Sequence, residues 1–215
     1  MKPRDAIREA LTKFVTPRLA RLGFSFSSSS LGFKRIQGDF TQRIYSHLDR
    51  WNAEDISASF YFSFAIHSRK YVKWHLNEYG VKPVNDFVAS EMYWNLHGWK
   101  HARPNAAHPE RNEIEMLNLL EDTLDVGIPF LEKYSDWDAA ARLLVSKRWF
   151  HAKASDFCLI AGNREAAHWC LREALTVWRQ QPNRSFFVGE REDVYLRLAK
   201  HFQEVSGDGL IVDPI

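Results

Sequence analysis

The chain has 215 residues and a mass of 25.1 kDa, and its 45% apolar and 26% charged residues exclude wholesale disorder. Two cysteines are too few for a disulfide framework, and no apolar run reaches a signal peptide or a membrane helix, so we expect a soluble, cytoplasmic protein. The net charge is only +2, but residues 1–50 carry 10 Lys and Arg against 4 Asp and Glu, whereas residues 111–215 carry 13 against 17.

The first segment is predicted to be a helix. Its apolar residues recur mostly at steps of three and four: Ile7, Leu11, Phe14, Val15, Leu19 and Leu22. Pro17 should kink or split this helix near Thr16, because proline lacks the amide donor and clashes with the preceding turn. Gly23 should then end it.

An antiparallel sheet of three to five strands should follow. Gly38-Asp39 suits a two-residue hairpin turn between a strand that contains Phe33 and a strand from Phe40 to Leu48. The clearest strand alternates six apolar side chains with small or polar ones, and the six are Ile56, Ala58, Phe60, Phe62, Phe64 and Ile66. A weaker strand is expected around residues 89–96.

The C-terminal half is predicted to be all helical. The stretch 98–110 contains two prolines and is the expected boundary between residues 1–110 and 111–206, with 207–215 as a frayed tail. Gly127 should end the first of these helices, Ser135-Asp136 should cap the next, and a helical hairpin should turn at Gly162-Asn163. The fold class is therefore α+β, with the N-terminal helix packed on the sheet and the two parts forming one compact unit.

Sequence motifs that would identify an enzyme are absent. The chain has no Walker loop, dinucleotide fingerprint, nucleophile elbow or paired-cysteine zinc pattern. His97, His101 and His108 lie in or beside one loop without a completing Asp or Cys, so we predict no metal, no cofactor and no catalytic residue. Cys158 and Cys170 flank the predicted helical turn and are expected to be buried, inert thiols.

Two resemblances add to this interpretation. Leu22-Gly23-Phe24, Phe33-Lys34-Arg35, the Gly-Asp turn and Gly127-Ile128-Pro129-Phe130-Leu131 resemble an uncharacterised bacterial family described only as a domain of unknown function, over about residues 1–135. The resemblance implies a small bacterial cytoplasmic protein, and related families include immunity-type proteins that neutralise a toxin. Residues 162–175 also resemble the second half of a tetratricopeptide repeat, but no second copy follows, which favours an ordinary helical hairpin.

Three function classes remain in competition. The leading hypothesis is a non-catalytic binding protein, an immunity or accessory factor that acts through a protein partner. The alternative is a nucleic-acid-binding module that uses the basic N-terminal half, with Tyr or Trp side chains as stacking platforms. A hydrolase ranks third, because acidic pairs such as Glu121-Asp122 have no identifiable partner base.

The residues predicted to bind a partner are Lys34, Arg43, Tyr45 and Tyr61. A two-residue turn at Gly38-Asp39 would place Lys34 opposite Arg43, on the face that points away from the core. Two opposed like charges are unfavourable, and such a pair can mark a site kept for an anionic partner. The competing explanation is that the acidic C-terminal helices cover and neutralise this face.

Overall fold

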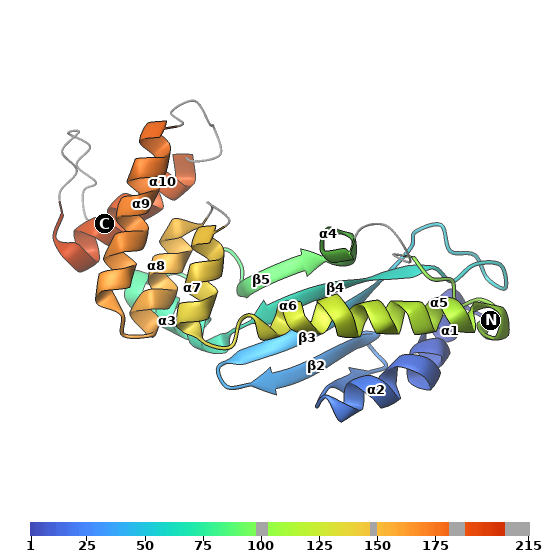
Figure 1. Ribbon diagram of the computed structural model, residues 1–215. Coiled ribbons are helices and arrows are strands. Elements are labelled where there is room, and N and C mark those ends of the chain that lie inside the picture. Colours follow the sequence, from blue (N-terminus) through green and yellow to red (C-terminus); the bar gives the residue numbers. More distant parts are fainter. Residues whose placement is uncertain (98–102, 147–149, 181–187, 205–215) are drawn as a thin grey trace. The chain divides into compact units, whose positions relative to one another are not determined.

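The computed structural model describes residues 1–97, 103–146, 150–180 and 188–204 (Figure 1). Its contacts divide the chain into two compact units: unit 1 contains residues 1–73 and 82–134, and unit 2 contains residues 74–81 and 135–215. Unit 1 holds the N-terminal helix and a five-stranded antiparallel sheet, whereas the described part of unit 2 is built from helices. The predicted α+β fold class is confirmed.

The N-terminal helix consists of α1 (Pro3–Ala10), a π-helical turn (Leu11–Val15) and α2 (Thr16–Arg21). Pro17 accounts for the π-helical turn, because a proline cannot donate an amide hydrogen bond to the turn before it. The hydroxyl of Thr16 donates to the carbonyl oxygen of Leu11 at 3.0 Å. Gly23 ends the helix with a φ of 83°, so the predicted disruption near Thr16 and the predicted stop are both confirmed.

The sheet contains β1 (Ser25–Ser27), β2 (Gly32–Gln37), β3 (Phe40–Leu48), β4 (Phe60–His67) and β5 (Phe87–Met92), in chain order. The β2–β3 hairpin turns at Gly38-Asp39, where Gly38 has a φ of 56°. The register pairs Phe33 with Ile44 and Lys34 with Arg43, as predicted.

Two strand predictions were wrong at their ends. The strand β4 begins at Phe60, because the preceding segment folds into a turn in which Ala53 and Ser57 form a backbone bridge. As a result Ile56, predicted to share the core face, is 71% exposed. The last strand ends at Met92, and the chain continues as the short helix α4 (Tyr93–His97) where a strand was predicted to reach residue 96.

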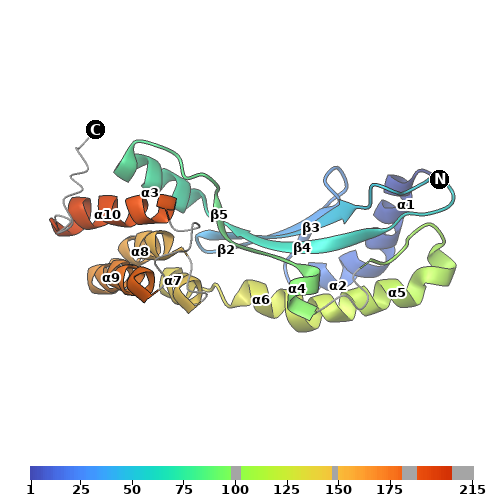
Figure 2. The ribbon, with the colours of Figure 1, turned by 90° about the horizontal axis from the view of Figure 1, so that it is seen from above.

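The core of unit 1 lies between the sheet and a second long helix. This helix consists of α5 (Pro109–Asp122), a π-helical turn (Thr123–Gly127) and α6 (Ile128–Glu132), and it runs along the same face of the sheet as α2 (Figure 2). The rings buried on this face of the sheet include Phe33, Phe60, Phe62 and Phe64. The boundary was predicted near residue 110, but the units divide between Tyr134 and Ser135, because this helix packs on the sheet.

Gly127 does not end a helix, contrary to the prediction, and its role is close packing. A Cβ atom at this position would lie 2.3 Å from the ring of Phe64, which is fully buried. Gly127→Ala should therefore lower the free energy of unfolding by about 1–3 kcal/mol, although alanine is the better helix former. Urea denaturation measures this loss, and Phe64→Leu in the same chain should recover part of it. An alanine variant as stable as the wild type would contradict the packing argument.

Unit 2 contains the end of α3 (Arg69–Tyr79) together with α7 (Trp137–Ser146), α8 (His151–Ile160), α9 (Arg164–Gln180) and α10 (Val188–Phe202). Asp136 caps α7 by accepting the amide of Ala139 at 2.7 Å, as predicted. The α8–α9 hairpin turns at Gly162, whose φ is 79°. Its helices pack through small or apolar side chains that are at most 3% exposed: Ala154, Cys158, Ala167, Cys170, Leu171 and Ala174. The predicted tail, residues 207–215, lies outside the described residues.

Candidate functional site

A cationic groove of about 800 Å³ lies in unit 1, on the face of the sheet that points away from the core. Strands β2 and β3, the end of β4 and the first turns of α3 bound it. Five cations line it, namely Lys34, Arg43, Arg69, Lys70 and Lys73, against two carboxylates, Asp39 and Asp86. We call this site the cationic groove. The excess of positive charge makes it suited to an anionic ligand.

Local structure explains why the cations converge. Side chains alternate between the two faces of a strand, so the pairing of Lys34 with Arg43 places both on the face opposite Phe33 and Ile44. Immediately after β4, the hydroxyl of Ser68 accepts the amide of Tyr71 at 3.3 Å and caps the start of α3. This helix supplies three of the groove cations, Arg69, Lys70 and Lys73.

Only part of this charge is paired internally. Lys70 donates to Asp39 at 2.8 Å. Within the described ranges, no carboxylate forms an ion pair with the other four groove cations, Lys34, Arg43, Arg69 and Lys73. The Nε atom of Arg43 is buried and has no hydrogen-bond partner there. A buried donor without an acceptor costs about 1–3 kcal/mol, so Arg43 is the least satisfied cation of the groove.

A hydrogen-bonded chain of three residues forms part of the groove lining. The Tyr45 hydroxyl lies 2.9 Å from Nε2 of His67, and Nδ1 of His67 lies 3.1 Å from the Asp86 carboxylate. The Asp86 carboxylate accepts a hydrogen bond from Nδ1–H of His67, so Nε2 of the neutral ring accepts a hydrogen bond from the Tyr45 hydroxyl. Burial lowers the pKa of His67, and the opposing effect of Asp86 is smaller. The chain therefore holds the Tyr45 ring in place beside the cations.

An aromatic row continues from the groove across the sheet, and it consists of Tyr45, His47, Tyr61 and Trp94. The ring centroids of Tyr45 and His47 are 6.4 Å apart. The His47 ring stacks on the Tyr61 ring, and their centroids are 4.9 Å apart. Trp94 follows at 4.9 Å from Tyr61. A hollow of about 350 Å³ adjoins the row, and small side chains are part of its lining, namely Ser63, Ala65 and Ser90. Tyr45 lines both the hollow and the cationic groove.

The four residues predicted to bind a partner share this face, but they do not all line the same cavity. Lys34, Arg43 and Tyr45 line the cationic groove, whereas Tyr61 lies farther along, in the aromatic row. Sequence reasoning missed His47, His67, Asp86, Trp94 and the cations of α3. One signal was readable, because Arg69, Lys70 and Lys73 follow the clearest strand with the spacing of one helix face.

Within unit 1, the carboxylate of a later helix pairs with a different arginine. Glu132 of α6 pairs with Arg35 at 3.2 Å. The Nε atom of Arg35 also donates to Gln42 at 2.8 Å, on the core side of the sheet. Lys34 and Arg43 receive no such carboxylate from the described part of α5 or α6. The described carboxylates of α5 and α6 therefore leave these two groove cations without an ion pair.

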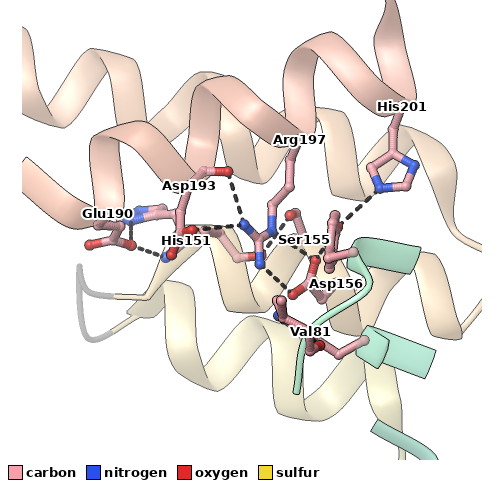
Figure 3. Close-up of polar contacts among 11 residues, drawn as sticks. Val81, His151, Ser155, Asp156, Glu190, Asp193, Arg197 and His201 are labelled. Carbon is pink, nitrogen blue, oxygen red and sulfur yellow. Dashed lines mark hydrogen bonds and ion pairs between the residues drawn. The ribbon is translucent and has the colours of Figure 1, made fainter. Parts of the chain in front are cut away.

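A second polar cluster is buried in unit 2 (Figure 3). Arg197 donates two hydrogen bonds of 2.8 Å to Asp156, and the two side chains are 5% and 0% exposed. Tyr79 donates to the same carboxylate at 2.9 Å, and its hydroxyl lies 3.0 Å from Nε2 of His201. Burial and Asp156 raise the pKa of Tyr79. Because its charges are matched within the cluster, this arrangement is structural.

His151 and Glu190 adjoin this cluster at the start of α8 (Figure 3). The Glu190 carboxylate accepts the His151 amide at 2.5 Å and thereby caps α8. Burial raises the pKa of Glu190 and lowers that of His151. His151 is 1% exposed, and we interpret the pair as part of the packing between α8 and α10.

No group of three or more His, Cys, Asp or Glu that could hold a metal is present in residues 1–97, 103–146, 150–180 and 188–204. His101 and the side chain of His97 lie outside what the structure describes, and His108 is exposed. None of the described helices combines the length and the apolar character needed to cross a membrane. No family model, curated protein or solved structure matches the chain.

Proposed function

We propose that this protein is a non-catalytic binding protein and that the cationic groove holds the anionic groups of a macromolecular partner. The observation that carries this proposal is a set of groove cations that no described carboxylate pairs, namely Lys34, Arg43, Arg69 and Lys73. Arg43 is partly exposed and lines the groove, so an anion that enters reaches its guanidinium. A phosphate or carboxylate would accept a charge-assisted hydrogen bond from the exposed part of this guanidinium.

The electrostatics of the groove support the same proposal. Lys34 and Arg43 lie directly opposite each other, which is unfavourable in the protein alone. An anion between them turns this repulsion into two favourable interactions. Arg69 and Lys73 extend the unpaired charge along α3, so a partner with several anionic groups gains more than a single small ion.

Charge reversal tests the groove. Lys34→Glu/Arg43→Glu should weaken binding of a labelled oligothymidylate at least about 100-fold at low salt, because two charge-assisted contacts of about 1.5–3 kcal/mol each are lost. Fluorescence anisotropy measures the dissociation constant, and thermal melting checks the fold. A labelled polyglutamate peptide in parallel asks whether carboxylates bind as phosphates do.

Arg18→Glu/Lys133→Glu is the matched control. Both side chains are exposed and lie outside the groove, and the net charge changes by the same amount. This variant should bind within about threefold of the wild type, since distant surface charges are screened by salt. Equal losses of binding in the two double variants would show that net charge alone explains the effect, and would refute the groove as the binding site. Failure of the wild type to bind either polyanion would refute the proposed function as well.

A further inference from the structure

We infer that the partner is single-stranded nucleic acid, with its phosphates in the cationic groove and its bases against the aromatic row. This inference rests on the proposed function and names the ligand class of the same site. It requires that the cations and the rings form one continuous surface. Tyr45 provides the connection, because it lines both the groove and the hollow beside the row.

The aromatic row is what distinguishes a nucleic acid from an acidic protein segment. Carboxylates need only the cations, whereas unpaired bases also stack on rings. The row contains half-buried rings from neighbouring strands. His47 of β3 and Tyr61 of β4 stack on each other, with their ring centroids 4.9 Å apart. The guanidinium of Arg103 lies 5.9 Å from the Tyr61 ring, and it also pairs with Asp49 at 3.1 Å.

The hollow beside the row has room for a flat group. Its lining combines the rings of Tyr45, His47 and Phe87 with smaller or flexible side chains, namely Ser63, Ala65, Ser90, Glu91 and Met92. Its volume of about 350 Å³ accommodates a nucleobase. The hydroxyl of Ser63 lies 2.7 Å from Nε2 of His47, which places polar atoms beside the rings for contacts to base edges.

A single strand fits this surface better than a duplex. Bases reach a ring only when their faces are exposed, and the bases of a duplex are stacked on one another. The site is also a groove on a sheet face, bounded by one helix, which differs from a helix or ribbon that enters a major groove. The phosphodiester chemistry is shared by RNA and DNA, so the experiment includes both.

The experiment compares strands that differ only in their bases. Anisotropy titrations of the full chain would use labelled oligothymidylate and oligouridylate of about 12 nucleotides, an abasic oligonucleotide of the same length, and a DNA duplex. We expect the two base-containing single strands to bind at least about tenfold more tightly than the abasic strand and the duplex. A difference between the uridylate and the thymidylate would assign RNA or DNA as the source.

A variant of the row separates stacking from charge. Tyr61→Leu should weaken binding of the oligothymidylate by about 5- to 150-fold and leave binding of the abasic strand unchanged. Trp51→Leu is the matched control, because Trp51 is 75% exposed and lies outside the row, and it should change neither.

The outcomes separate this inference from the proposed function. The abasic strand, the thymidylate and polyglutamate could bind equally well, and Lys34→Glu/Arg43→Glu could abolish all three. This result would leave the groove as an anion site and overturn the nucleic-acid inference. Binding of the duplex as tightly as the single strand would also overturn it. If no polyanion binds, the proposed function fails and the inference fails with it.

Discussion

Arg197→Ala should lower the free energy of unfolding of unit 2 by about 3–5 kcal/mol. Arg197 and Asp156 are almost fully buried and share two hydrogen bonds of 2.8 Å. Removal of the guanidinium leaves the Asp156 carboxylate in the interior without its counter-charge, and such an unpaired buried charge is strongly destabilising. Urea denaturation followed by circular dichroism measures the loss.

A double variant shows whether charge or packing is responsible. In Asp156→Leu/Arg197→Met both charges are replaced by apolar groups of similar size, and Tyr79 keeps its contact with His201. We expect this variant to be within about 1.5 kcal/mol of the wild type, because apolar replacement of a complete buried ion pair is often neutral or stabilising. A loss below about 1 kcal/mol for Arg197→Ala, or equal losses in both variants, would contradict the ion-pair argument.

Phe62→Ala should cost unit 1 about 3–5 kcal/mol of unfolding free energy. The Phe62 side chain is fully buried. Its ring packs edge-on against Phe33, with the centroids 6.4 Å apart, and tilted against Phe60, with the centroids 5.6 Å apart. Alanine would remove the ring and leave a cavity among residues that cannot collapse into it. Urea denaturation of the full chain gives the value.

The matched control is Ile56→Ala. The alternating pattern in the sequence places Ile56 on the same face as Phe62, but in the structure its side chain is 71% exposed. Its truncation should cost less than about 0.5 kcal/mol. A large loss for Ile56→Ala would place it in the core and show that β4 starts earlier, while a loss below about 1 kcal/mol for Phe62→Ala would mean that its face is not the core.

The sequence was sufficient where local chemistry decides the structure. Gly38-Asp39 sets a two-residue turn, and the turn together with alternation sets which residues of β2 and β3 face each other. It was insufficient where tertiary packing decides. The alternation continues to Ile56 although the chain turns at residues 53–57. Gly127 has the local appearance of a helix stop, and only the position of the Phe64 ring reveals that it allows close packing.

The candidate site was predictable to the same extent. Lys34, Arg43 and Tyr45 were found because they depend on the β2–β3 register alone. The cations of α3 have the spacing of one helix face in the sequence. They join the groove only because β4 brings the chain to that face of the sheet, and this placement depends on tertiary packing. His67 and Asp86 meet next to a bulge between β4 and β5, at Ile66 and His67, and a single sequence carries no signal for that bulge.

The Arg43 side chain itself offers the most direct test of the central claim. ¹H–¹⁵N spectra resolve arginine Nε–H groups, and the signal of Arg43 is assigned by its loss in Arg43→Lys. During titration with oligothymidylate, the account predicts that this signal shifts, because an anion bound to the exposed part of the guanidinium changes the surroundings of its Nε–H group. An Arg43 Nε–H signal that stays in place at saturation, while the nucleic acid binds, would contradict the assignment of the cationic groove as the binding site.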